Sequence, residues 1–275
     1  MRSSGSSTGP ERSVFGMDWI VMGDAGGQVP PLTAFAHVAK AVRDFILSSW
    51  EGPIPEIVSG HAPDGSPSRA PHLTVVPLAQ VGAAHADGRL MGLAVLLPRR
   101  AGEGKKAAFR DDVRRRLACF LASDAPMTLT LAALGAWCIE HRQAPFGLVR
   151  DPARYAGPAR LWATVTPIVL DRYPKAKLSA EAIVADASRR IGLPRPRHVG
   201  LSRLSPIPGV PPSRAVGEAR AWTLPLRRDN SRHPVERRLS THAVIEYADP
   251  VCGPVLLGSA RFVGLGLCLP IAGGE

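Results

Sequence analysis

A glycine-rich stretch between two apolar runs constrains this chain most, because it must place tight turns beside buried strand-like segments. The stretch is GPVLLGSARFVGLGLCLP, residues 253–270, and it holds Gly258, Gly264 and Gly266 with Arg261 as its one cation. Glycine accepts positive φ angles and lets a second segment come close. A bulged β-hairpin explains this pattern, and so does a loop whose backbone N–H groups and arginine bind phosphate.

Length and charge set the class of partner. The 275 residues are enough for one large domain or two of ordinary size. The formal net charge of +11 favours an anionic partner, with nucleic acid first and a membrane surface second. Arginine far outnumbers lysine, a bias that a GC-rich genome also produces, so the charge supports this interpretation without carrying it.

The chain lacks the usual signals for metal binding, secretion and membrane insertion. The cysteines form no CxxC pair, and no HExxH or HxxxH motif occurs, so neither a metal nor another cofactor is expected. Residues 1–14 contain no apolar signal segment, and no run of 18 apolar residues exists. We therefore expect a cytoplasmic protein with no membrane partner.

The first half of the chain alternates strand and helix patterns in the order βαββαβ. This order is the split βαβ motif of ferredoxin-like domains. The helices are predicted from apolar residues at three- and four-residue spacing, as in Phe35, Val38, Val42, Phe45 and Ile46. The predicted segments are a strand at 15–22, a helix at 32–49, strands at 72–78 and 89–98, a helix at 107–121, and a strand or strand pair at 127–139.

The second half follows the same order of elements, except that its pattern predicts only one helix. A proline- and glycine-rich connection at 142–160 precedes it, and Ser179 is a plausible N-cap for its helix. The predicted segments are a strand at 161–170, a helix at 179–191, and strands at 199–204, 221–226 and 241–247. We expect an α+β protein with two tandem ferredoxin-like (RRM-like) domains and a C-terminal glycine-rich loop. The expected divisions are a disordered leader or linker at 1–14 and domains at 15–150 and 151–275.

Three histidines around an irregular loop are the candidate catalytic residues. His61, His72 and His85 lie within 25 residues on glycine- and proline-rich connections. No GxSxG elbow occurs, and the cysteines lie in apolar runs that raise thiol pKa values, so nucleophilic catalysis is set aside. Imidazoles titrate near neutrality, so one or two of them can move both protons in metal-free cleavage of RNA. Each histidine taken singly is also typical of a surface or a hydrogen-bonded core.

Basic residues near these histidines are the candidate phosphate contacts, since guanidinium groups clamp phosphate oxygens in pairs. They lie on the irregular loop, at the predicted strand 89–98, and in the loop before the predicted helix 107–121. The candidate RNA-binding residues are Arg69, Arg89, Arg99, Arg100, Lys105, Lys106, Gly258, Arg261, Gly264 and Gly266.

Four blocks of this sequence resemble a known family. SGHAPDG at 59–65, PHLTVVPLAQVG at 71–82, HADGRLMGLAVLLPR at 85–99 and the glycine-rich stretch at 253–270 are similar to the Cas-six-type half of the Cas-five/Cas-six fusion proteins of type I-G (formerly I-U) CRISPR systems. The likeness extends over nearly all of the chain from about residue 15. The Cas-five-like half has no counterpart in this sequence, so it is expected either on a separate chain or in a part that this sequence does not include.

This resemblance implies a metal-independent endoribonuclease that cuts precursor CRISPR RNA within each repeat. It implies products with a 2′,3′-cyclic phosphate and a 5′-hydroxyl, and retention of the crRNA for an interference complex with a Cas-five-like domain and other type I-G subunits. In such enzymes the catalytic histidine lies on or just after the first helix, where this sequence has His37 and His61. His61 is favoured because it lies on the loop and in a family-like block, whereas His37 lies inside the helix in no matching motif, and His72 is the second choice.

Two other functions remain open on the sequence alone. The chain is compatible with a non-cleaving subunit that holds an RNA hairpin in a CRISPR ribonucleoprotein complex. It is also compatible with an α+β protein whose basic surface reflects genome composition. A histidine beside the terminal loop would favour the endoribonuclease over these two functions.

Overall fold

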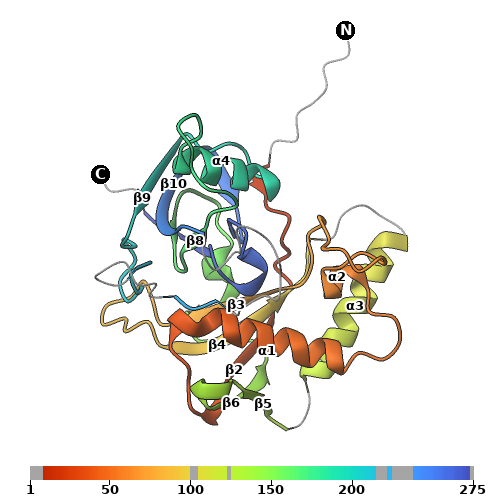
Figure 1. Ribbon diagram of the computed structural model, residues 1–275. Coiled ribbons are helices and arrows are strands. Elements are labelled where there is room, and N and C mark those ends of the chain that lie inside the picture. Colours follow the sequence, from red (N-terminus) through yellow and green to blue (C-terminus); the bar gives the residue numbers. More distant parts are fainter. Residues whose placement is uncertain (1–8, 100–104, 123–124, 215–221, 225–237, 273–275) are drawn as a thin grey trace.

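The computed structural model describes residues 9–99, 105–122, 125–214, 222–224 and 238–272. The fold is α+β, with one five-stranded and one six-stranded sheet (Figure 1). This architecture is compatible with the predicted pair of ferredoxin-like domains. The exact division at residue 150 stays a prediction.

The first sheet is antiparallel throughout and runs in the order β3–β4–β2–β6–β5. With its helices it gives the predicted split βαβ order, and the last predicted strand forms as a hairpin of two strands. The elements are β2 (Ile20–Gly27), α1 (Phe35–Ser48), α2 (Glu56–Ser59), β3 (Thr74–Ala79), β4 (Leu90–Leu96), α3 (Lys105–Leu121), β5 (Met127–Thr130) and β6 (Ala136–Arg142), with short 3-10 turns at Leu32–Ala34 and Ala132–Leu134.

Helix α1 packs through the apolar stripe that its spacing predicts. Phe35, Val38, Val42 and Ile46 are 0% exposed. Phe45 was expected in the same stripe but is 37% exposed, because it lies about 100° around the helix from Ile46. The buried stripe fixes α1 on the sheet and so fixes the side chains on its flanks.

The second sheet is built around the long strand β10. This strand pairs with β9 on one side and with β7 on the other, and β11 completes the sheet beyond β7. Ser179 caps α4 by accepting a hydrogen bond from the Ala182 N–H, as predicted. The elements are β7 (Ala159–Thr164), β8 (Ile168–Val169), α4 (Ala180–Arg190), β9 (His198–Ser202), β10 (Ser240–Cys252) and β11 (Cys268–Pro270), preceded by 3-10 turns η3 (Leu148–Arg150) and η4 (Pro152–Tyr155).

Among the residues described between β10 and β11, a single 3-10 turn stands where a ferredoxin-like domain has its second helix. This turn is η6 (Arg261–Val263), inside the glycine-rich stretch. The predicted strand at 221–226 is wrong for residues 222–224, which form no strand, and its other residues lie outside the described part.

The predicted disordered leader is wrong for residues 11–14. Strand β1 (Glu11–Arg12) pairs in parallel with the end of β10, and Ser13 is buried with its hydroxyl donating to the Pro254 carbonyl. This segment therefore ties the start of the chain to the glycine-rich stretch. Residues 1–8 lie outside the described part.

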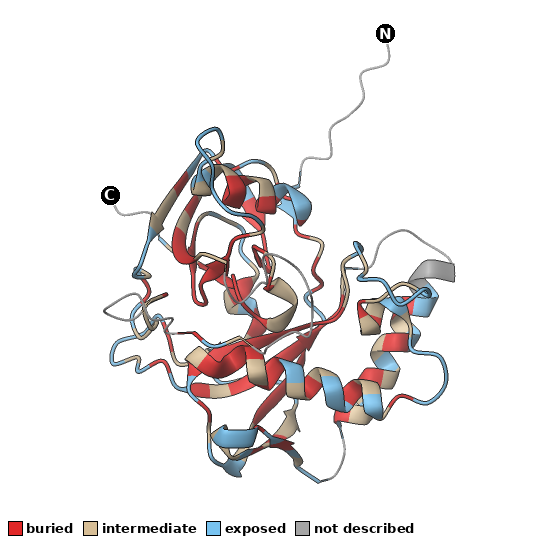
Figure 2. Cartoon of the chain, in the orientation of Figure 1, coloured by how far each residue is buried: buried red, intermediate tan, exposed pale blue. Residues whose placement is uncertain are grey.

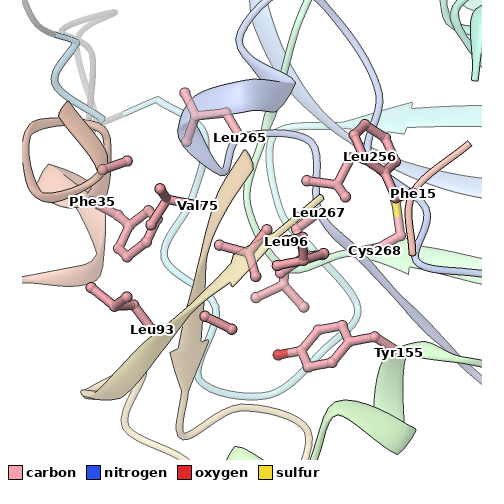
Figure 3. Packing of buried hydrophobic residues seen from close by; sticks show 14 of the residues in the cluster. Phe15, Phe35, Val75, Leu93, Leu96, Tyr155, Leu256, Leu265, Leu267 and Cys268 are labelled. Carbon is pink, nitrogen blue, oxygen red and sulfur yellow. The ribbon is translucent and has the colours of Figure 1, made fainter. Parts of the chain in front are cut away.

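One hydrophobic core joins the two sheets. It contains strand residues of both sheets, and the buried residues continue from one to the other (Figure 2). Figure 3 shows Phe35 of α1 and Val75 of β3 in the same core as Leu265 and Leu267 of the glycine-rich stretch. Within the described residues, no helix combines the length and the apolar character needed to cross a bilayer.

Candidate functional site

The glycine-rich stretch folds back on itself and packs against the first sheet. Leu256 and Leu267 form a bridge, and the Leu257 N–H donates to the Gly266 carbonyl over 3.0 Å. Gly264 has a φ of +80°, and a Cβ there would lie 2.5 Å from Phe35 Cε1 and 2.6 Å from the Val75 carbonyl oxygen. Only glycine allows η6 to approach α1 and β3 this closely.

The other two glycines that were predicted to bind RNA are also buried. A Cβ at Gly258 would lie 2.3 Å from the Val169 carbonyl oxygen, and one at Gly266 would lie 1.9 Å from the Leu257 carbonyl oxygen. The structure therefore gives these glycines a packing role. Their contact with RNA stays a prediction that no observation tests.

Two side chains of η6 connect this stretch to a histidine of the first sheet. The ring of Phe262 stacks on the imidazole of His72, with ring centres 3.6 Å apart and an interplanar angle of 26°. The Arg261 guanidinium lies 4.5 Å from the centre of the Phe262 ring and donates to the Gly258 carbonyl over 2.9 Å. The Phe262 ring therefore contacts both the imidazole of His72 and the guanidinium of Arg261.

His72 is held as a neutral ring. It lies two residues before β3, and its Nδ1 lies 3.1 Å from the Ala70 carbonyl oxygen. Burial lowers the pKa of His72 to about 4; the hydrogen bond to Ala70 opposes this shift, while the charges of Arg43, Arg261 and His61 add to it. At neutral pH the ring is therefore uncharged.

His61 lies on the turn that follows α2, where a short hairpin closes through a bridge between His61 and Pro67. Its Nδ1 lies 3.0 Å from the Ser59 carbonyl oxygen. The Arg43 guanidinium, which extends from α1, donates to the same carbonyl and lies 3.5 Å from His61 Nδ1. Gly60 places the two histidines side by side, because a Cβ there would meet His72 Nε2 at 2.7 Å.

The two histidines are oriented by the same local device. In each, Nδ1 faces the backbone carbonyl two residues earlier, at Ser59 for His61 and at Ala70 for His72. A carbonyl only accepts hydrogen bonds, so we assign the proton of each neutral ring to Nδ1. The lone pair then lies on Nε2, which is the form of imidazole that acts as a base.

A further histidine, which is fully buried, shows the contrast. His242 is 0% exposed, its Nε2 lies 3.0 Å from the Pro211 carbonyl oxygen, and its Nδ1 lies 2.9 Å from the Thr164 hydroxyl. Burial lowers its pKa to about 4. Both of its nitrogens are used within the fold, so His242 is a structural residue.

The remaining predicted residues divide between the two ends of β3 and β4. His85 and Arg89 lie in or beside the loop that joins these strands, whereas His72 precedes β3, about 20 Å away along six strand residues. The grouping of His85 with His61 and His72 is therefore wrong. Arg99 follows β4 and lies at the His72 end, since Leu96 pairs with Thr74.

Other basic candidates are only partly located. Arg69 is exposed, on the segment between His61 and His72. Lys105 and Lys106 begin α3, but their side chains, like the whole of Arg100, lie outside the described residues. Nowhere in the described part of the chain does a group of three or more His, Cys, Asp and Glu side chains lie where it could hold a metal ion.

Two residues of this cluster were missed by sequence reasoning. Arg43 lies outside the apolar stripe of α1, and helical periodicity does not show that a long side chain reaches a neighbouring loop. Phe262 was passed over as one more apolar residue. An aromatic directly after the one cation of a glycine-rich loop was the available signal, since such pairs recur where proteins bind RNA.

Comparison with known proteins finds a family model that matches the second half of the chain. Residues 147–270 match the family model described as CRISPR-associated protein, GSU0054 family. The match covers a little under half of the chain, including the second sheet and the whole glycine-rich stretch, and supports a CRISPR-associated family with a role in CRISPR systems. His61 and His72 lie outside the matched residues. No curated protein and no solved structure matches.

Proposed function

We propose that this protein is a metal-independent endoribonuclease that cleaves precursor CRISPR RNA within its repeats and then retains the crRNA. The observation that carries the proposal is that His72, which lies near His61, stacks on Phe262 beside Arg261, about 190 residues further along the chain. The family match supports the CRISPR setting but leaves the reaction open.

The proposed reaction needs a base, an acid and positive charge at one phosphate. His61 Nε2 accepts the proton of the ribose 2′-OH, and the 2′-oxygen forms a bond to the adjacent phosphorus. The bond from phosphorus to the 5′-oxygen breaks, and the His61 imidazolium returns its proton to that oxygen, as one histidine can serve both transfers. The products are a 2′,3′-cyclic phosphate and a 5′-hydroxyl.

The neighbouring residues have supporting roles in this proposal. His72, which its lowered pKa leaves uncharged at neutral pH, is proposed as the second proton-transfer or phosphate-contacting residue. The cations Arg43 and Arg261 stabilise the charge that develops on the phosphorane. The crRNA is then kept for an interference complex with a Cas-five-like domain and other type I-G subunits.

One observation favours a second function, a non-cleaving subunit that holds an RNA hairpin. His72 is stacked between Gly60 and Phe262, and its pKa of about 4 makes it a weak base. If His61 is equally inactive, the cluster serves only to join the glycine-rich stretch to the first sheet.

Incubation with the cognate repeat RNA in EDTA separates these functions. We expect cleavage at one position in the repeat, at the same rate with and without the chelator. Cleavage that EDTA abolishes contradicts the metal-free mechanism. Tight binding of RNA that stays intact contradicts the nuclease and supports the hairpin-binding subunit.

Arg261→Ala is expected to weaken RNA binding in either case. One lost phosphate contact should flatten the dependence of log K on log salt by about one counterion. The measurement is a salt titration of RNA affinity, with Arg261→Lys as the matched variant that keeps the charge and the slope. An unchanged slope for Arg261→Ala shows that this residue does not touch the RNA backbone.

A further inference from the structure

We propose that Arg43 is a positioning residue that fixes the ring of His61 through the Ser59 carbonyl and sets the charge environment of both histidines. The inference deepens the proposed nuclease function and rests on it. It concerns a residue on α1, outside the loops that carry His61 and His72.

The geometry of Arg43 ties a helix to the histidine-bearing hairpin. Its Nη2 donates to the Ser59 carbonyl, which also accepts from His61 Nδ1 over 3.0 Å. One carbonyl oxygen therefore receives both groups, and rotation of the imidazole would bring Nδ1 away from its acceptor. The ring is left with Nε2 directed away from this carbonyl.

The backbone of Arg43 is held in place because α1 is packed against the sheet. Its neighbours Val42 and Ile46 are 0% exposed, so α1 is held against the sheet on both sides of Arg43 in the sequence. The hairpin at 60–68 has few buried side chains, so the contact with Arg43 holds it in position relative to the helix.

Arg43 also acts on the second histidine. The charged and titratable groups that face His72 are Arg43 from α1, Arg261 from η6, and His61 from the hairpin after α2. Each of these lowers the pKa of His72 by disfavouring its charged form. Loss of the Arg43 charge should therefore raise the pKa of His72, an effect that a purely structural contact would not produce.

The test uses nitrogen NMR of histidine side chains in the RNA-free protein, followed across pH. Wild type should show His61 and His72 as Nδ1–H tautomers. Arg43→Gln should raise the pKa of His72 and convert His61 to a mixture of tautomers, whereas Arg43→Lys should keep the pKa of His72 near its wild-type value. Lys40→Gln, which removes an exposed cation from the same helix, is the matched control and should change neither.

Cleavage kinetics form the second arm. Arg43→Gln should slow cleavage on the order of 10-fold to 100-fold through misplacement of His61. If Arg43→Gln fails to fold, the His61 tautomers of Arg43→Lys decide, since a loosened His61 ring is expected there too.

Two results overturn the inference. One is a folded Arg43→Gln protein with the wild-type His61 tautomer and the wild-type pKa of His72. The other is an equal shift in Lys40→Gln. If the wild-type protein cuts no RNA, the nuclease proposal fails, yet the NMR arm still decides whether Arg43 positions His61.

Discussion

His61→Ala is expected to slow cleavage of the repeat RNA by roughly 10²–10⁴-fold, the usual contribution of a positioned general base or acid. The loss should lie near the upper end, because the same ring is proposed to accept and return the proton. RNA affinity should stay close to wild type, since the positive charges that hold the backbone are unchanged. Single-turnover cleavage and a binding titration on the same RNA measure the two effects separately.

His85→Ala provides the matched control for this substitution. His85 is likewise a loop histidine of the first sheet, and it is exposed, but it lies at the opposite end of β3 from His72. The His85→Ala protein should cleave the repeat RNA at the wild-type rate. Wild-type cleavage by His61→Ala would show that His61 is not catalytic and would make His72 the next residue to replace.

Gly264→Ala is expected to destabilise the fold by roughly 2–4 kcal/mol, from a strained positive φ and from overpacking. The new methyl group would meet Phe35 and the backbone of Val75 at well under contact distance. The side chain of Phe35 is itself fully buried, so neither neighbour can move freely. Urea unfolding followed by tryptophan fluorescence measures the change.

Gly52→Ala isolates the backbone part of this effect. Gly52 has a φ of +78°, close to the +80° of Gly264, but a Cβ there would meet nothing within 4 Å. It should cost only the strain of the left-handed conformation, on the order of 1 kcal/mol. Equal destabilisation by the two substitutions would contradict a packing role for Gly264 between η6 and the first sheet.

Much of the fold follows from local sequence patterns. Apolar spacing predicts α1, and a serine N-cap with a glycine stop predicts α4, because both signals act within one helix. The same reasoning failed at residues 11–14, whose polar composition hides the pairing of β1 with β10, more than 200 residues away. Composition indicates the local preference of a segment, but it does not show which strand the segment pairs with in the folded protein.

The site was predicted in part, for the same reason. His61 and His72 stand out as histidines on loops, and Arg261 as the one cation of its stretch. The exclusion of His85 depends on the direction of β3, and the inclusion of Arg43 depends on the path of a hairpin relative to a helix. Both are tertiary facts. The glycines were assigned to RNA because positive φ angles in a turn and close packing against a neighbour leave the same mark in a sequence.

The central claim is that the cluster of His61, His72, Arg43, Arg261 and Phe262 cuts RNA with the ribose 2′-OH as nucleophile. Mass spectrometry of the upstream fragment, after cleavage of the repeat RNA in EDTA, tests it most directly. The account predicts a 2′,3′-cyclic phosphate at the new 3′ end, with this product lost in His61→Ala. A 3′-hydroxyl at that end, or a cyclic phosphate formed equally well by His61→Ala, would contradict it.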